Sequence, residues 1–124
     1  MSNRELAYVK DVGIMSGGFG HIPRTLNNGV DLRITESDLT LSPSNEALVL
    51  DGFDTKTISF ADVKRIELKK DSMNPDWHVL AVSLKGGHWW NKRGVGQIVL
   101  RDWQFAQVAD ALKSVRELGS KLRI

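Results

Sequence analysis

The sequence predicts a mainly β protein of the α+β class, in which about seven short antiparallel strands precede one amphipathic helix. Three observations support this fold class. Apolar and polar residues alternate with period two in several short runs between residues 30 and 101, as in strands that bury one face. Turn-forming residues separate these runs, and after residue 101 the apolar spacing changes to that of a helix. We expect a small barrel or two packed sheets, with the helix as a cap.

The predicted strands begin after residues 27–29 (Asn-Asn-Gly), a sequence that favours a turn. In the first strand, Val30, Leu32 and Ile34 share one face, which we expect to be buried. The predicted strand at residues 77–84 is apolar on both faces and is therefore expected to be covered on both sides. In order, the predicted strands are residues 30–35, 39–41, 48–50, 56–60, 62–70, 77–84 and 98–100.

The predicted helix follows the last strand. Asp102 is expected to be its N-cap, because a carboxylate can accept hydrogen bonds from the free amides of the first turn. Gly119 is a natural stop. The apolar stripe that should pack on the sheet contains Phe105, Val108, Ala109, Ala111, Leu112, Val115 and Leu118.

The first 28 residues are harder to interpret. Residues 7–15 are apolar but have no clear period, and the glycines of residues 17–20 with Pro23 oppose regular structure. The Gly-rich segment lacks the Lys-Ser/Thr end of a P-loop and the third glycine of a dinucleotide site. We therefore divide the chain into an N-terminal extension with a Gly-rich connector, residues 1–28, and one domain, residues 29–124.

Composition sets limits on function. The chain contains no Cys, which excludes disulfides, thiolate catalysis and Cys-based metal sites. No signal peptide or membrane-spanning run is evident, so a cytoplasmic location is expected. Charge is unevenly distributed: residues 1–84 carry a net charge of −3 and residues 85–124 carry +5. Such asymmetry can mark an end that faces anions, or simply a solvated helix face beside a basic hairpin.

No constellation of catalytic residues emerges. There is no Gly-x-Ser-x-Gly elbow and no carboxylate pair in an apolar setting, so we expect a protein that is not an enzyme and has no cofactor. Asp76 and His78 could share one ion, with His21 or His88 as further ligands, but no metal-ligand spacing supports this. A partly buried, hydrogen-bonded His78 is the preferred interpretation, without a metal.

One segment looks suited to contact with a partner. Residues 85–94 form a predicted hairpin tip in which two adjacent Trp must point to opposite sides. An exposed Trp beside cations could stack on bases, sit among lipid headgroups or anchor a protein interface. Alternatively, the Trp pair could close the open end of a barrel. The candidate binding residues are Lys85, His88, Trp89, Trp90, Lys92 and Arg93.

Three stretches resemble the pleckstrin-homology-like superfold, including its GRAM and bacterial relatives. They are residues 30–35 with 38–41, residues 57–66 (TISFADVKRI) and the helix after Arg101. The resemblance implies a barrel of seven antiparallel strands capped by a helix, and a non-enzymatic binding role. Domains of this family that bind phosphoinositides usually carry Lys and Arg around the first hairpin. Here residues 33–38 contain two acids and one base, so specific phosphoinositide binding is not expected there.

The predicted function is a binding module that engages a partner protein or an anionic membrane surface through the hairpin at residues 85–94. Two alternatives stay open. The same hairpin could bind nucleic acid, with an affinity that falls steeply with salt. The chain could also be a structural subunit that forms a homo-oligomer through a strand edge or its apolar N-terminal segment.

Overall fold

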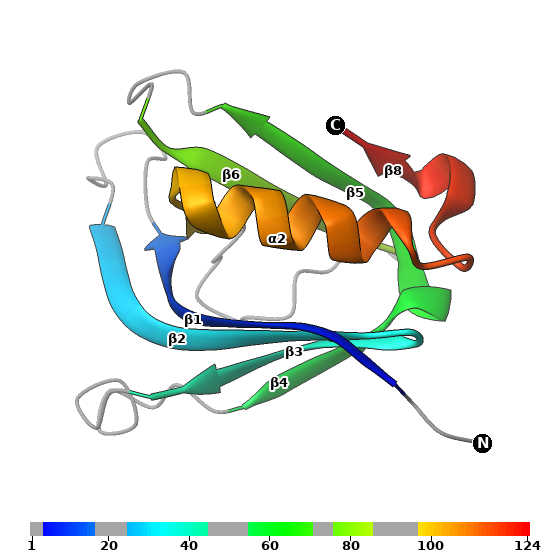
Figure 1. Ribbon diagram of the computed structural model, residues 1–124, viewed down its shortest axis with the longest axis horizontal. Helices are drawn as coiled ribbons and strands as arrows, with labels where there is room; N and C mark the ends of the chain where they lie inside the picture. Colours follow the sequence, from blue (N-terminus) through cyan, green and yellow to red (C-terminus); the bar gives the residue numbers. More distant parts are fainter. Residues whose placement is uncertain (1–3, 17–24, 45–54, 71–75, 86–96) are drawn as a thin grey trace.

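The computed structural model describes residues 4–16, 25–44, 55–70, 76–85 and 97–124. They form one eight-stranded sheet with the order β4-β3-β2-β1-β7-β6-β5-β8, crossed by one α-helix (Figure 1). The predicted class, mainly β with a helix after the strands, is confirmed. The elements are β1 Glu5–Ser16, β2 Thr25–Thr35, β3 Asp38–Pro43, β4 Lys56–Ser59, the 3₁₀ turn η1 Phe60–Asp62, β5 Val63–Lys70, β6 His78–Leu84, β7 Gln97–Leu100, α2 Asp102–Lys113, the 3₁₀ turn η2 Gly119–Lys121 and β8 Leu122–Arg123.

The prediction of seven antiparallel strands in a barrel or two packed sheets is wrong in its details. Over the described residues there is one sheet of eight strands, with β4 and β8 at its open edges. The pairing of β5 with β8 is parallel, whereas the other strand pairs are antiparallel. The two strands missing from the predicted list are β1 and β8. The predicted strand at residues 48–50 lies outside the described residues.

β1 is central to the sheet and bends sharply together with β2 (Figure 1). Val9 pairs with Leu32 and Val12 pairs with Val30, so three residue steps on β1 match two steps on β2 and β1 carries an extra residue there. Asp11, within this bulge, has a φ of 58°. The next step puts the extra residue on β2 at Gly29, whose φ of 100° favours glycine. Gly29 therefore lies in a bulge within β2, where a turn before the strand was predicted. The paired bulges let the end of β1 turn towards β7.

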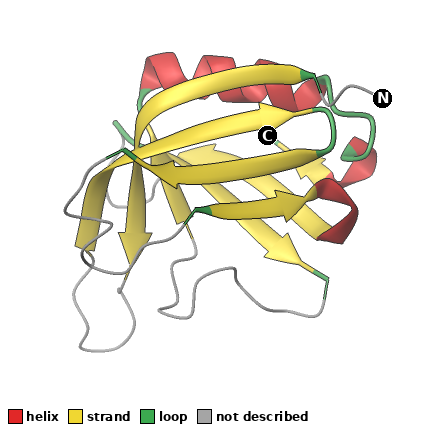
Figure 2. Ribbon diagram, turned by 90° about the horizontal axis from the view of Figure 1, so that it is seen from below, coloured by secondary structure: helices red, strands yellow, loops and turns green. Residues whose placement is uncertain are grey.

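The bent sheet encloses a single core, and α2 lies across its concave side (Figures 1 and 2). Side chains of the two sheet halves meet there with the apolar stripe of the helix. Burying this stripe is what fixes α2 against the sheet. The largest apolar side chains of the core are Leu32, Ile34, Leu39, Leu41, Phe60, Ile66, Leu80, Ile98, Leu100, Leu112 and Leu118.

The helix begins one residue earlier than the capping prediction. Its N-cap is Arg101, and Asp102 is the first helical residue. The Gln104 side chain replaces the predicted carboxylate cap, since its Oε1 accepts a hydrogen bond from the Arg101 N–H at 2.9 Å. A turn follows Lys113 and buries Val115 and Leu118.

The expectation that the strand at residues 77–84 is covered on both sides is confirmed in β6 only at Val79, since Ala81 and Ser83 on the same face are partly exposed. Leu80 and Val82 belong to the main core, whereas Val79, on the opposite face, is also buried but outside that cluster. The helices described are too short and too polar to cross a bilayer.

Candidate functional site

A pocket lined by four cations lies where β5 and β6 meet the segment that follows the helix. Its volume is about 280 Å³, and we call it the basic pocket. Two hydroxyl groups complete the lining, so the pocket offers positive charge together with neutral hydrogen-bond donors. The lining residues are Lys64, Arg65, Ser83, Ser120, Lys121 and Arg123.

A bulge in β5 supplies two of these cations. Val63 is paired with Leu84, and Arg65 with Ser83, which leaves Lys64 as an extra residue on β5. In a regular strand, neighbouring side chains point to opposite faces. Here the bulge breaks that alternation, and Lys64 and Arg65 are both exposed between the buried Val63 and Ile66. Two consecutive cations can therefore line the same pocket.

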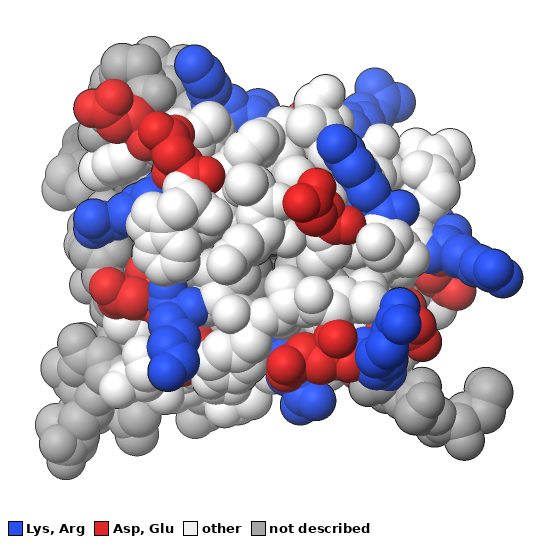
Figure 3. Space-filling model, viewed as in Figure 1, with Lys and Arg blue, Asp and Glu red and all other residues white. Residues whose placement is uncertain are grey.

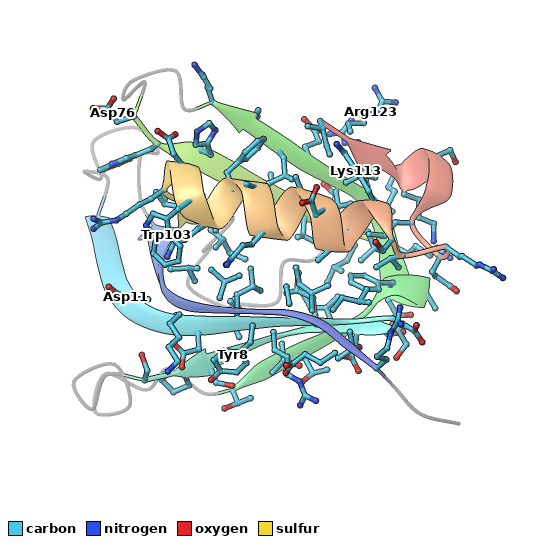
Figure 4. All side chains as sticks on the ribbon, viewed as in Figure 1. Tyr8, Asp11, Asp76, Trp103, Lys113 and Arg123 are labelled. Atoms are coloured by element: carbon cyan, nitrogen blue, oxygen red, sulfur yellow. The ribbon has the colours of Figure 1, made fainter. Side chains whose placement is uncertain are left out.

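The other two cations come from the segment after the helix. η2 provides Ser120 and Lys121, and β8 then runs parallel to β5 with Arg123 beside Glu67. In Figure 4, Arg123 projects from β8 away from α2. A hydrogen bond orients the Lys121 side chain, since its Nζ donates to the Phe60 carbonyl at 3.4 Å. Residues far apart in the sequence thus meet at one edge of the sheet.

Acidic side chains compensate this charge only in part. Arg65 Nε lies 2.7 Å from Glu67 Oε1 in an ion pair. Within the described ranges, no carboxylate forms an ion pair with Lys64 or Arg123. Clustered like charges repel one another, so an anion that enters the pocket relieves repulsion as well as accepting hydrogen bonds. The pocket is suited to an oxyanion such as a phosphate group.

Of the residues predicted as a binding site in the hairpin, Lys85 lies within the described part of the chain. Lys85 is exposed and directly follows β6, two residues after Ser83, and its N–H donates a hydrogen bond to the Asp62 carbonyl at 2.8 Å. The predicted hairpin therefore leaves the sheet close to the basic pocket. The other predicted site residues, His88, Trp89, Trp90, Lys92 and Arg93, lie outside the described residues, and their role stays a prediction.

Sequence analysis did not identify the lining residues as a site, although two signals were present. Val63 and Ile66 are apolar positions three residues apart within a strand, a spacing that indicates a bulge. The excess of positive charge in residues 85–124 includes Lys121 and Arg123. What the sequence could not reveal is the parallel pairing that brings β8 to β5.

His78 is held by protein groups, as the preferred interpretation of the sequence predicted. Its Nε2 lies 2.7 Å from Asp102 Oδ1, and its ring stacks on Phe105 with centroids 4.3 Å apart. His78 is 9% exposed. Across the ranges that the structure describes, no three His, Cys, Asp or Glu side chains gather to hold a metal ion.

A second hollow, of about 340 Å³, lies between β1 and α2. Tyr8 stands at its side, with its hydroxyl donating a hydrogen bond to Asp31 Oδ2 at 2.9 Å. The other oxygen, Oδ1, accepts from the Asp11 N–H at 3.2 Å. The Asp31 carboxylate raises the pKa of Tyr8 above its usual value of 10.0, chiefly through this hydrogen bond. The full lining is Leu6, Ala7, Tyr8, Gln107, Asp110, Ala111 and Ser114.

The helix side of the molecule differs from the basic pocket in its charge. Around α2, Lys, Arg, Asp and Glu are interspersed and border a broad uncharged area (Figure 3). Trp103 is 57% exposed and stands near the start of α2, at the opposite end from β8 (Figures 1 and 4). A single exposed aromatic residue of this kind needs no partner. The concentration of one sign of charge therefore singles out the basic pocket.

Comparison with known proteins adds no family to this description. No family model, curated protein or solved structure matches the chain. The geometry of the basic pocket is therefore the basis for a function.

Proposed function

We propose that this chain is a non-enzymatic, pleckstrin-homology-like module that binds an anionic membrane surface through the basic pocket. The observation that carries the proposal is the convergence of Lys64, Arg65, Lys121 and Arg123 on one pocket. The sequence of the predicted hairpin, which begins at Lys85, adds further cations and two Trp, and Trp side chains favour the headgroup region.

The strand order supports the family part of the proposal. The first seven strands follow the order β4-β3-β2-β1-β7-β6-β5, with a central β1 that joins two antiparallel halves and a helix that follows β7. Antiparallel pairing of the strands and one covering helix are what the resemblance implied. Closure into a barrel is not part of the proposal.

A membrane surface suits this arrangement better than a deeply buried ligand. Lys64, Arg65 and Arg123 are exposed and Lys121 is half-buried, so each cation contributes little to a single contact in water. Near an anionic bilayer each Lys or Arg contributes about 1 kcal/mol, which adds up over a cluster. The cytoplasmic location expected from the sequence would place the pocket opposite an anionic leaflet.

The proposal is tested by sedimentation with vesicles of phosphatidylcholine, with and without phosphatidylserine. We expect binding to the anionic vesicles that weakens as salt is raised. At about fivefold for each lost charge, Lys64→Gln/Arg65→Gln should lower the affinity by about 25-fold. The matched control is Lys69→Gln/Lys70→Gln, which removes the same charge from exposed residues of the same strand outside the pocket.

Three outcomes would count against the proposal. Absence of binding by the unmodified chain would remove it, and equal losses in the two double variants would reduce it to attraction by net charge. Tighter binding to a single-stranded oligonucleotide than to the vesicles, lost with Lys64→Gln/Arg65→Gln, would make the pocket a nucleic-acid site.

The double variant Trp89→Ala/Trp90→Ala tests the predicted hairpin separately. We expect it to bind the anionic vesicles more weakly than the unmodified chain.

A further inference from the structure

The basic pocket is assembled from two parts that differ in how firmly they are held. One part, Lys64, Arg65 and Ser83, belongs to β5 and β6, which are paired over seven register positions. The other part belongs to residues 119–123, here called the β8 segment, and supplies Ser120, Lys121 and Arg123. Half of the lining therefore depends on where this segment lies.

The attachments of the β8 segment are few. β8 pairs with β5 at two positions, Ile66 with Leu122 and Glu67 with Arg123. Leu122 is partly buried against the core, and Lys121 reaches the Phe60 carbonyl. The buried Leu118 fixes the chain just before the segment. A short parallel strand at a sheet edge belongs to the part of a structure that opens most readily.

Charge opposes this docking in the absence of a ligand. Docking brings Lys121 and Arg123 to the pocket that Lys64 and Arg65 already line. Glu67 offsets this repulsion in part, since it pairs with Arg65 and lies beside Arg123 in the register. An anion in the pocket interacts favourably with both parts and so favours the docked arrangement over the open one.

We propose that anion binding and docking of the β8 segment are coupled, so that the pocket is a conditional site completed only when residues 119–123 lie on β5. This rests on the proposed function, and it adds a means of regulation to it. The coupling is reciprocal: a bound anion holds the segment down, and detaching the segment weakens the site in proportion to the docked fraction that is lost.

The first test follows amide hydrogen exchange in the full chain with and without a saturating anion. Inorganic pyrophosphate and phosphatidylserine vesicles serve as separate probes, which distinguishes a free phosphate from a lipid headgroup. We expect exchange in residues 119–124 to slow severalfold, while the paired amides of β5 and β6 change little. Binding without any slowing in this segment would overturn the coupling.

The second test weakens docking without altering any lining residue. Leu122→Ala removes a partly buried side chain and should lower anion affinity about three- to tenfold, because the docked fraction falls. Ile124→Ala is the matched control, since Ile124 is 57% exposed and has no strand partner among the described residues. Unfolding midpoints of both variants establish that the fold is retained.

The results of these tests distinguish a failure of the coupling from a failure of the proposed membrane binding. If Lys64→Gln/Arg65→Gln weakens binding but Leu122→Ala does not, the membrane site stands and the coupling is wrong. If neither probe binds the unmodified chain, the proposed function fails and the coupling fails with it. Slowed exchange together with a selective effect of Leu122→Ala supports both.

Discussion

The Tyr8 hydroxyl donates to a carboxylate that also holds the β1 bulge, because Asp31 accepts from both Tyr8 and the Asp11 N–H. Ionisation of Tyr8 would abolish its hydrogen bond and place two negative charges side by side. The pKa of Tyr8 is therefore raised in the folded protein. Its stabilising contribution is complete below pH 10, the pKa of an unfolded Tyr, and is lost as pH rises through the higher folded pKa.

The resulting prediction is that Asp31→Asn lowers the pKa of Tyr8 towards its usual value, because the carboxylate that opposes ionisation is gone. Ultraviolet absorbance of tyrosinate measures this directly, since the chain contains a single Tyr. Asp62→Asn, at an exposed position in η1, is the control and should leave the titration unchanged. An unchanged Tyr8 pKa in Asp31→Asn would contradict the assigned hydrogen bond.

At the scale of elements, Gln104 joins the helix to the bulge of β1. Its side chain is 1% exposed. The amide Nε2 donates to the carbonyls of Lys10 and Asp11 at 2.8 and 3.1 Å, while Oε1 accepts from the Arg101 N–H. One side chain thus caps the helix and satisfies carbonyl groups that the bulge turns away from the regular ladder.

Gln104→Leu should therefore destabilise the protein by about 2–3 kcal/mol, because it leaves buried backbone groups without hydrogen-bond partners. Urea unfolding monitored by circular dichroism measures the change. Gln107→Leu, one turn along at an exposed helix position, is the matched control and is expected to stay within about 0.5 kcal/mol of the unmodified chain. Similar losses in the two variants would show that Gln104 contributes only through helix packing.

Bulges also explain which elements the sequence could predict. Residues 30–34 of β2 and residues 38–41 of β3 keep period two, and inward residues of β2 such as Leu32 and Ile34 were predicted as a buried face. In β1 the buried Val9 and Val12 are three apart because Asp11 adopts a positive φ between them. That spacing departs from the period of two of a regular strand, so the sequence pattern was ambiguous and this strand was left unassigned.

For the whole molecule, the basic pocket was hidden from sequence reasoning for a different reason. Its cations lie near residue 64 and near residue 122, and the contact between them is a parallel pairing of two residues. A strand of two residues is too short to show an alternation of apolar and polar residues in the sequence. The charge asymmetry along the chain indicated that residues 85–124 were basic, but it could not place that charge beside Lys64 and Arg65.

The position of β1 predicts how the molecule tolerates truncation. β1 lies between β2 and β7 and joins the two halves of the sheet. It also places Val9 and Val12 in the core, both at 0% exposure. Two buried Val contribute about 3–6 kcal/mol, and removing the strand leaves two sheet edges unpaired as well. This loss is comparable with the whole stability of a small domain.

We therefore expect a chain that begins at residue 17 to lose its cooperative urea transition and most of its β signal in far-ultraviolet circular dichroism. A chain that ends at residue 118 is the control, because it removes an edge strand paired at two positions. That control should keep a cooperative transition while binding anionic vesicles more weakly, since three residues of the basic pocket are gone. A folded chain without residues 1–16 would mean that the two halves of the sheet can hold together without β1, as an N-terminal extension outside the domain would allow.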